Sequence, residues 1–524
     1  MQSYSLTVDK FLDHAAKWSG DREIVTGEIG RVGYLELRAR ANRLSGALAT
    51  LGLKLGDRIG TLAWNTQHHL EIYYAAMGAG IVCHTLNPRL TAAHLAAMVN
   101  EAEDRVLALA ANLTPLLAEL APLCRGLEHI VLMDGPAAPP GLLDGAVRIW
   151  THEDLLASSG GETVWGAFDE ETPAGLCYTS GTTGRPKGVL YTHRSNYLHT
   201  LRALQADSIA LTAADALLVA VPMFHANGWG LPFAAPAVGA KLVLPGRHTD
   251  GASLASLMRD EGVTVAAGVQ TVWQGVLDHL DAVGGDLPDL KRIIIGGSSC
   301  PDALIRRMKD RLGVQVQTSW GMTELSPMGT ISPPGAAPAA RRASGRPLMG
   351  LDMKLTDAEG IAVPQQRGVV GHLKVKGASV IERYFKAETT ALDAEGYFDT
   401  GDLASLDEAG DLTICGRSKD LIKSGGEWIN PAEIEEIIGR HPSVGQVAVI
   451  GRTDAKWGER PLLIVEVRQG QTVEDEALLG TLRGKIASWW VPDGVVQVDA
   501  MPLAATGKID KIRLRAEYAN WENP

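Results

Sequence analysis

The sequence predicts an α/β fold. We expect a large N-terminal domain of mixed, mostly parallel sheets flanked by helices, and a small, mobile α/β C-terminal domain. Apolar runs of strand length alternate with stretches of helical period up to residue 299, which is typical of parallel sheets covered by helices. From Gly350 onward the runs are shorter and predict a β subdomain with antiparallel strands. Hydrophobic residues make up 45% of the 524 residues, which is enough for a large core.

The first clear pair of elements lies at residues 34–65. Apolar residues recur at helical spacing over residues 34–53, and Gly52 marks the end of this predicted helix. Residues 57–65 follow as a short apolar run and predict a buried strand. The same alternation predicts six further strands within residues 104–110, 129–135, 214–224, 240–246, 263–269 and 290–299.

The pattern changes after a stretch rich in Pro, Gly and Ala at residues 331–347, which predicts a loop. Residues 368–385 and 411–426 then predict short, partly antiparallel strands. We place the domain boundary inside the second of these segments. The predicted domains are residues 1–417 and residues 418–524.

A helix is predicted to begin beside Asn430, within the C-terminal domain. Asn430 suits the N-cap, Pro431 suits the first helical position, and Glu433 occupies the acidic position of a capping box. Three isoleucines then fall on one face of the helix: Ile434, Ile437 and Ile438. This pattern supports a small, separately packed α/β unit at the end of the chain.

Composition narrows the function classes. A formal net charge of −12 argues against nucleic acid as the main partner, because phosphate backbones bind cationic surfaces. The five cysteines are scattered without a CxxC pair, which favours reduced thiols over a disulfide framework or a zinc site. The amino-terminal stretch is too charged for a signal peptide, and no apolar run reaches the roughly 18 residues of a membrane span. We expect a cytoplasmic protein without a transmembrane segment, and a homodimer as the default for this size.

Residues 178–194 combine small residues, hydroxyls and one lysine in a way that favours a phosphate-binding loop. Glycines let backbone N–H groups approach a ligand closely, and the Ser and Thr side chains add donors. Lys187 supplies a positive charge, and Pro186 stiffens the chain beside it. The spacing is not that of a Walker A loop. A flexible linker is the alternative, but linkers usually lack a lysine and a preceding strand.

Further motifs follow this loop in order. They are PMFHANGWG (222–230), IIGGSSCP (294–301), SWGMTE (319–324), YFDTGDL (397–403), GRSKDLIKSGGEWINPAEIE (416–435) and PLAATGKIDK (502–511). Together the series resembles the acyl-adenylate-forming superfamily, which includes acyl-CoA synthetases, luciferase-type enzymes and the adenylation domains of peptide synthetases. The resemblance extends over nearly the whole chain. It is strongest to medium- and long-chain fatty acyl-CoA synthetases and to 3-(methylthio)propionyl-CoA ligases.

The resemblance implies two half-reactions in one site. A carboxylic acid attacks the α-phosphate of ATP to give an acyl-adenylate and pyrophosphate, and a thiol, usually that of coenzyme A, then displaces AMP. Because the attack brings negative charges together, such a site must neutralise charge and align the reactants. The resemblance implies ATP and Mg²⁺ as cofactors and coenzyme A as a co-substrate.

The resemblance also assigns residues to the phosphates and the metal ion. The loop implied to hold the β- and γ-phosphates comprises Thr179, Ser180, Gly181, Thr182, Thr183, Gly184 and Lys187. Thr323 is implied to bind the α-phosphate. Glu324 is implied to hold Mg²⁺, a hard cation that prefers oxygen ligands.

The nucleoside is implied to contact three further segments. The residues implied to lie against adenine are Gly297, Ser298, Ser299 and Trp320. The neighbours of Trp320 are implied to bind the nucleotide as well: Ser319, Gly321 and Met322. Trp320 stands where the family often has tyrosine and offers an equivalent stacking face. Asp402 is implied to accept hydrogen bonds from the ribose hydroxyls, and Arg417 to contact ribose or phosphate.

The C-terminal domain is implied to serve both half-reactions in two poses. Lys508 resembles the lysine that bridges the attacking carboxylate and the α-phosphate during adenylation. Lys419 occupies the family's hinge position, about which the domain rotates. In the second pose a different segment is implied to border the pantetheine tunnel, with Lys423, Gly425, Gly426, Glu427 and Trp428.

The acyl pocket is implied to lie near Trp229 and Gly230, with residues 268–280 as a further wall. His225 is implied to be a catalytic residue between this pocket and the adenylate, where it would orient the carboxylate or gate entry of the thiol. Few fixed charges occur in these stretches, which favours an alkyl or short thioether acid over an amino acid. The sequence leaves open the length of the substrate's acyl chain. It also leaves open three alternatives to a CoA ligase: a fatty acyl-AMP ligase that loads a carrier protein, an oxygenating luciferase, and a non-catalytic binding relative.

Overall fold

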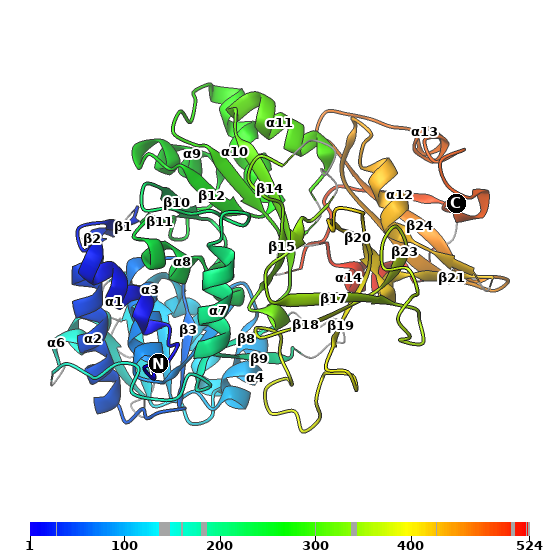
Figure 1. Cartoon of the computed structure of the whole chain (residues 1–524). Helices are drawn as coiled ribbons and strands as arrows, with labels where there is room; N and C mark the ends of the chain where they lie inside the picture. Colours follow the sequence, from blue (N-terminus) through cyan, green and yellow to red (C-terminus); the bar gives the residue numbers. More distant parts are fainter. Residues whose placement is uncertain are drawn as a thin grey trace.

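The computed structural model describes residues 1–27, 29–135, 147–158, 161–179, 186–298, 300–336, 343–425, 427–504, 509–519 and 521. The chain runs from an N-terminal lobe on the left of Figure 1, through a second lobe at the top, to a C-terminal unit on the right. The β17–β20 sheet lies between these parts in the same view. The predicted fold class, with mixed sheets flanked by helices and a smaller C-terminal α/β unit, is confirmed.

The first lobe contains a seven-stranded sheet in the order β7-β6-β5-β3-β4-β8-β9, parallel except for the β8–β9 pair. The strands are β3 (Arg58–Leu62), β4 (Val82–Leu86), β5 (Val106–Ala110), β6 (His129–Met133), β7 (Arg148–Thr151), β8 (Pro173–Tyr178) and β9 (Gly188–Thr192). The helices of this part are α1 (Asp9–Trp18), α2 (Tyr34–Thr50), α3 (Gln67–Gly78), α4 (Ala92–Ala102), α5 (Thr114–Leu120), α6 (His152–Ala157) and α7 (His193–Ala203).

The second lobe contains a nine-stranded sheet in the order β16-β15-β14-β13-β12-β10-β11-β1-β2, with a parallel centre and antiparallel edges. Its strands are β1 (Glu23–Thr26), β2 (Gly30–Gly33), β10 (Ala216–Val219), β11 (Lys241–Leu244), β12 (Val265–Gly268), β13 (Arg292–Ile295), β14 (Gln315–Gly321), β15 (Met328–Ile331) and β16 (Arg346–Pro347). Its helices are α8 (Leu231–Val238), α9 (Gly251–Asp260), α10 (Gln270–Val283) and α11 (Asp302–Leu312).

The rest of the chain forms two smaller sheets. An antiparallel four-stranded sheet comprises β17 (Leu351–Thr356), β18 (Val370–Gly377), β19 (Phe398–Leu406) and β20 (Leu412–Arg417). A five-stranded sheet comprises β21 (Ile422–Ser424), β22 (Glu427–Ile429), β23 (Val444–Asp454), β24 (Gly458–Val467) and β25 (Val495–Val498), with helices α12 (Pro431–Ile438), α13 (Asp475–Gly480) and α14 (Lys511–Glu517). The antiparallel character predicted for this half is confirmed.

Helix α12 begins as predicted, with one difference in its cap. The Asn430 side chain accepts a hydrogen bond from the Ala432 backbone N–H at 3.1 Å. The Glu433 carboxylate accepts from the Asn430 side-chain amide at 3.3 Å, where a capping box would use the N-cap backbone N–H. The Asn430 side-chain amide also donates a hydrogen bond to the Cys415 carbonyl at 2.7 Å. This second hydrogen bond connects α12 to β20.

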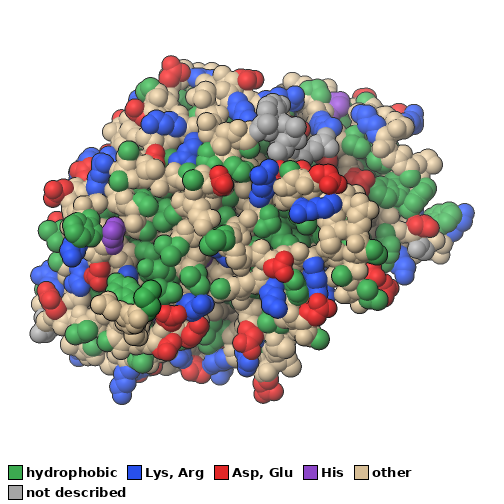
Figure 2. Space-filling model, viewed as in Figure 1, with side chains coloured by type: hydrophobic (Ala, Val, Ile, Leu, Met, Phe, Trp, Pro, Cys, Tyr) green, Lys and Arg blue, Asp and Glu red, His purple; other side chains and the backbone are tan. Residues whose placement is uncertain are grey.

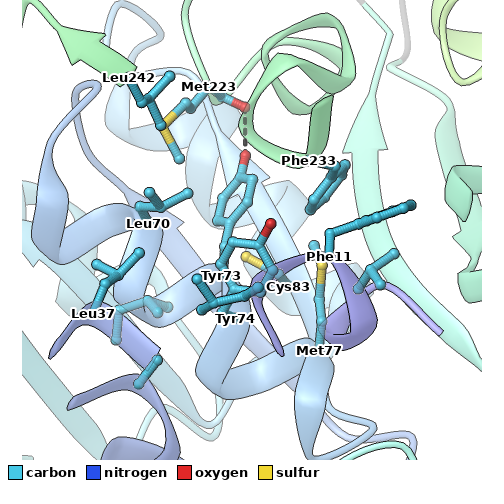
Figure 3. Packing of buried hydrophobic residues seen from close by; sticks show 14 of the residues in the cluster. Phe11, Leu37, Leu70, Tyr73, Tyr74, Met77, Cys83, Met223, Phe233 and Leu242 are labelled. Carbon is cyan, nitrogen blue, oxygen red and sulfur yellow. Dashed lines mark hydrogen bonds between the residues drawn. The ribbon is translucent and has the colours of Figure 1, made fainter. Parts of the chain in front are cut away.

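The largest core cluster joins the two lobes. Figure 3 shows Tyr73 and Tyr74 of α3 among Phe11, Phe233 and other buried side chains. The Tyr73 hydroxyl donates to the Met223 carbonyl at 2.5 Å, and both residues are fully buried. This bond fixes the first lobe to the segment that leads into residues 225–230.

We expect Tyr73→Phe to lower the free energy of unfolding by about 1–3 kcal/mol, because it leaves the buried Met223 carbonyl without its donor. Urea denaturation followed by fluorescence measures the change. Tyr4→Phe, at a ring that is 62% exposed, is the matched control and should leave the midpoint unchanged. An unchanged midpoint for Tyr73→Phe would show that this bond contributes nothing to the lobe contact.

Candidate active site

The predicted phosphate loop connects the antiparallel strands β8 and β9. Its two ends are hydrogen-bonded, because the Thr179 N–H donates to the Lys187 carbonyl at 2.9 Å. Thr179 is half-buried and Lys187 is exposed. Five residues predicted for this loop lie outside the described residues: Ser180, Gly181, Thr182, Thr183 and Gly184. The described part therefore fixes the position of the loop ends.

A tyrosine that the sequence analysis did not single out connects the loop end to Glu324. The Lys187 Nζ lies 4.7 Å from the centroid of the Tyr384 ring, within range of a cation–π contact. The Tyr384 hydroxyl donates to Glu324 Oε1 at 2.9 Å. Tyr384 follows strand β18 in a segment without a family motif, so only the tertiary structure reveals its place.

Glu324 lies in the short 3₁₀ helix η4 (Thr323–Leu325), between β14 and β15. The Tyr191 hydroxyl of β9 donates to the Thr323 carbonyl at 2.8 Å, which attaches η4 to the hairpin that carries the loop. Thr323 and Glu324 are both buried, at 9% and 7% exposure.

The Glu324 carboxyl group combines burial with nearby positive charge. Burial raises its pKa, while the Tyr384 hydrogen bond and the charges of Arg417 and Lys187 act in the opposite direction. A buried carboxylate whose charged form lacks water gains most from a cation placed against it. A buried carboxylate oxygen of Glu324 is therefore a suitable ligand for a divalent cation such as Mg²⁺.

Asp402 is held between a tryptophan and an arginine. The Trp320 indole N–H donates to Asp402 Oδ2 at 3.0 Å, and Arg417 Nε lies 2.9 Å from Asp402 Oδ1. Asp402 and Arg417 are paired across β19 and β20, and Asp402 is 2% exposed. The Trp320 ring packs over Gly329, where an added Cβ would come within 2.5 Å of it. An indole therefore gives this position a hydrogen bond to the carboxylate in addition to an aromatic face.

The predicted adenine turn follows β13, at the carboxyl ends of the parallel strands where α/β folds bind ligands. Ser319 Oγ donates to the Ile295 carbonyl at 3.0 Å and joins β14 to this turn. Gly297 has a φ of +83°, and Ser298 is exposed. Ser299 lies outside the described residues. Gly321 and Met322 are half-buried at the end of β14, where the chain turns into η4.

The predicted acyl-pocket segment has an unusual backbone. In η3 (Ala226–Gly230) every residue has a left-handed φ, between +46° and +74°. Non-glycine residues held there cost of order 1–3 kcal/mol each, and such strain clusters at functional sites. Asn and Gly tolerate it best, so the letters ANGWG carried a signal for this backbone in addition to the family resemblance.

This strained turn places Trp229 beside the adenine turn. An added Cβ on Gly296 would lie 3.1 Å from the Trp229 ring. Trp229 is 8% exposed, and His225 is half-buried just before the turn. Gly230 allows the His199 ring to approach, since a Cβ would lie 3.0 Å from it. Trp229 and the predicted adenine turn are thus close neighbours in the fold, and His225 directly precedes the strained turn.

The residues predicted for the second pose are not brought to this site. Strand β21, which carries Lys423, lies at the right edge of Figure 1, away from the β8–β9 hairpin. The Lys423 Nζ lies 5.4 Å from the centroid of the exposed Trp428 ring. Glu427 is exposed, and Gly425 has a φ of +61° that allows close packing of Trp457.

Of the three remaining predicted residues, only Lys419 lies within the described residues. Lys419 is exposed in the 3₁₀ turn η6 (Ser418–Asp420), which links β20 to β21. Gly426 and Lys508 lie outside the described residues. Helix α14, which follows Lys508 in the chain, is tied to η6 by the Arg515–Asp420 ion pair at 2.6 Å.

The visible surface carries mixed charge. On the face shown in Figure 2, Lys and Arg side chains are interspersed with Asp and Glu, without an extended basic area. Within the described ranges, none of the helices has the length and apolar character needed to cross a bilayer.

Comparisons with known proteins agree with this geometry. The AMP-binding enzyme family model matches residues 11–385, and the AMP-binding enzyme C-terminal domain model matches residues 433–508. A 3-methylmercaptopropionyl-CoA ligase of Ruegeria lacuscaerulensis is 44% identical, over 99% of this chain and 98% of that protein. A medium-chain-fatty-acid–CoA ligase of Ectopseudomonas oleovorans is 42% identical, over 99% and 97%.

A solved structure extends the likeness to three dimensions. ATP-bound MatB from Rhodopseudomonas palustris is 27% identical and superposes with a TM-score of 0.86 over 99% of both chains. The predicted resemblance to the acyl-adenylate-forming superfamily is confirmed. The chain belongs to the AMP-binding enzyme family, to which its acyl-CoA ligase relatives also belong.

Proposed function

We propose that this protein is an AMP-forming acyl-CoA synthetase, an ATP-dependent carboxylic acid–CoA ligase that acts on medium- to long-chain fatty acids. One observation carries the proposal: Tyr384 contacts both Lys187, at the end of the phosphate loop, and the buried Glu324. The relatives at 42% and 39% identity, named as medium-chain and long-chain fatty acid CoA ligases, support the substrate class.

In this proposal the predicted site residues neutralise and orient ATP. Lys187 and the loop donors hold the β- and γ-phosphates, and Thr323 holds the α-phosphate. Glu324 holds Mg²⁺, which supplies Lewis-acid charge neutralisation between the phosphates. Asp402 accepts from the ribose hydroxyls, and Trp320 together with the 297–299 turn holds adenine. Fixed donors and charges of this kind stabilise the transition state without having to reorganise.

We also propose that the chain works as two domains, residues 1–417 and 418–524, which rotate about Lys419. Lys508 reaches the α-phosphate in the first pose. Residues 423–428 replace it in the second and guide the thiol of coenzyme A to the acyl carbon. The exposed state of Lys423, Glu427 and Trp428, away from the β8–β9 hairpin, supports a rearrangement between the two half-reactions.

A second candidate substrate is 3-(methylthio)propionate. The relative at 44% identity is named as a 3-methylmercaptopropionyl-CoA ligase, and the apolar wall at Trp229 suits a thioether as well as an alkyl chain. A homodimer and a cytoplasmic location remain part of the proposal. The first rests on chain size, and the second on the scattered cysteines.

A substrate panel tests the proposal. The enzyme is incubated with ATP, Mg²⁺ and carboxylic acids from C3 to C16, including 3-(methylthio)propionate, with and without coenzyme A. We expect AMP, pyrophosphate and a CoA thioester, with the highest kcat/KM for acids of C8 or longer. Acyl-AMP that accumulates without a thioester would favour a fatty acyl-AMP ligase, and preference for the thioether acid would favour the second candidate.

The pH profile should report on Glu324. Burial raises the pKa of this carboxyl group, so on acidification it takes up a proton at a higher pH than an ordinary glutamate. A protonated carboxyl group does not hold Mg²⁺, so kcat/KM for ATP at subsaturating Mg²⁺ should fall as the pH drops through that pKa.

The pH profile of kcat/KM in the Tyr384→Phe variant tests whether the acidic limb belongs to Glu324. The Tyr384 hydrogen bond lowers the pKa of Glu324, so its removal should move the acidic limb toward higher pH. A limb that stays in place or moves toward lower pH would contradict the assignment of that limb to Glu324.

A further inference from the structure

Two histidines and three carboxylates far apart in the sequence meet at the edge of the first lobe. His68 lies in the first turn of α3, His152 and Glu153 begin α6, and Asp134 directly follows β6. Glu71, one turn after His68 on α3, completes the group. Helix α6 lies at the far left of Figure 1, opposite the C-terminal unit, so this cluster is separate from the candidate active site.

Three donor atoms of this cluster converge on one point. His68 Nε2 lies 3.5 Å from Glu153 Oε1, and His152 Nδ1 lies 3.4 Å from the same oxygen. One donor atom from each residue lies within 4.8 Å of the other two. Donor atoms bound to a tetrahedral zinc ion are about 3.3–3.4 Å apart, since each lies about 2.0–2.1 Å from the metal. The two spacings to Glu153 Oε1 match the edges of such a site.

The other ring nitrogen of each histidine faces a carboxylate. His68 Nδ1 is hydrogen-bonded to Asp134 Oδ1 at 2.7 Å, and Asp134 in turn accepts from Thr66 Oγ1 at 2.9 Å. His152 Nε2 lies 3.3 Å from Glu71 Oε2, yet it is a buried atom without a hydrogen-bond partner. Metal-binding histidines are usually oriented by carboxylates in this way.

The charge of the cluster also favours a cation. Glu71 and Glu153 both contact the guanidinium of Arg40, at 2.7 Å for Glu71, and Asp134 pairs with His68. Three carboxyl groups thus lie around the two imidazoles and the Arg40 guanidinium, and a divalent ion would add positive charge to this acidic group. The Glu153 side chain is 59% exposed and offers an entry path, while His152 is 2% exposed.

We propose that His68, His152 and Glu153 bind one zinc-type divalent transition-metal ion, with a fourth position open to water. Two imidazoles and one carboxylate suit Zn²⁺ and Co²⁺ better than Mg²⁺ or Ca²⁺, which prefer oxygen ligands alone. The site joins α3, α6 and the end of β6, so the bound ion clamps this edge of the lobe. It is independent of the ATP site proposed above.

Titration with Co²⁺ tests the site. Chelator-treated protein without nucleotide should take up one equivalent of Co²⁺, with the intense visible absorption of tetrahedral cobalt, and Zn²⁺ should displace it. His68→Asn and Glu153→Gln should each abolish this absorption. Asp134→Asn should weaken binding by roughly 10–100-fold, because it alters only the partner of His68.

Two controls separate binding from folding. His94→Asn, at an exposed histidine, should leave the titration unchanged. The His68 and Glu153 variants should keep wild-type adenylation activity, which shows that they fold. The proposal is overturned if no saturable tetrahedral spectrum forms, or if that spectrum persists in both ligand variants.

Discussion

The Lys508→Ala variant should lose adenylation activity by roughly two to three orders of magnitude, since it removes a charge aimed at the developing transition state. The resemblance places this lysine between the attacking carboxylate and the α-phosphate, where two negatively charged reactants meet. The rate of acyl-AMP formation, followed by pyrophosphate release in a single turnover, measures the loss. Binding of ATP should change much less, because Lys187 and the loop remain.

The second half-reaction separates this role from a general defect. With preformed acyl-AMP and coenzyme A, Lys508→Ala should form the thioester at close to the wild-type rate, because residues 423–428 serve that step. Lys485→Ala, at an exposed lysine of the same domain, is the matched control and should be active in both assays. Acyl-AMP formation at the wild-type rate in Lys508→Ala would remove this residue from the mechanism.

The Glu324→Gln variant should lower kcat/KM for ATP by roughly 10²–10³-fold, the loss typical of a group that stabilises transition-state charge. The amide keeps the size of the side chain and still accepts from Tyr384, but it no longer attracts a divalent cation. Activity should become nearly independent of Mg²⁺ in the range where the wild-type enzyme saturates. Steady-state kinetics over a matrix of ATP and Mg²⁺ concentrations measures both effects.

A neighbouring carboxylate provides the control. Glu382→Gln changes an exposed glutamate two residues before Tyr384 and should leave the Mg²⁺ dependence unchanged. If Glu324→Gln kept the wild-type response to Mg²⁺, the metal ion would have to be held by other groups.

Much of the fold was predictable because parallel strands buried on both faces leave continuous apolar runs. Each of the seven apolar runs predicted as strands contains one strand of the structure, for example β5 within 104–110 and β13 within 290–299. Strand order was not predictable from these runs. It depends on which apolar faces meet, as when β1 pairs with β11 far along the chain.

The candidate site was predictable where its residues occur in contiguous motifs. Thr323, Glu324 and Asp402 are examples, and the structure brings Glu324 close to Lys187 through Tyr384. Tyr384 itself carried no local signal, because its role arises from a contact between distant segments. The hydrogen bond from Trp320 to Asp402 is likewise a tertiary feature that residue type alone does not reveal.

The histidine cluster was missed for the same physical reason. Metal motifs are read from short spacings such as CxxC, and scattered cysteines argued against a zinc site. His68 and His152 belong to different helices and meet only when α3 and α6 pack together on the same edge of the sheet. The spacing of residues along the sequence therefore does not predict this contact.

We expect a carboxylate oxygen to attack the α-phosphate of ATP in the site formed by the 179–187 loop, Glu324 and Asp402. A carboxylic acid labelled with ¹⁸O in both oxygens tests it directly, with ATP, Mg²⁺ and coenzyme A present. Mass spectrometry should find one ¹⁸O atom in the AMP and none in the pyrophosphate, because thiol attack at the acyl carbon leaves the bridging oxygen on phosphorus. Unlabelled AMP, or label in pyrophosphate or inorganic phosphate, would contradict the account.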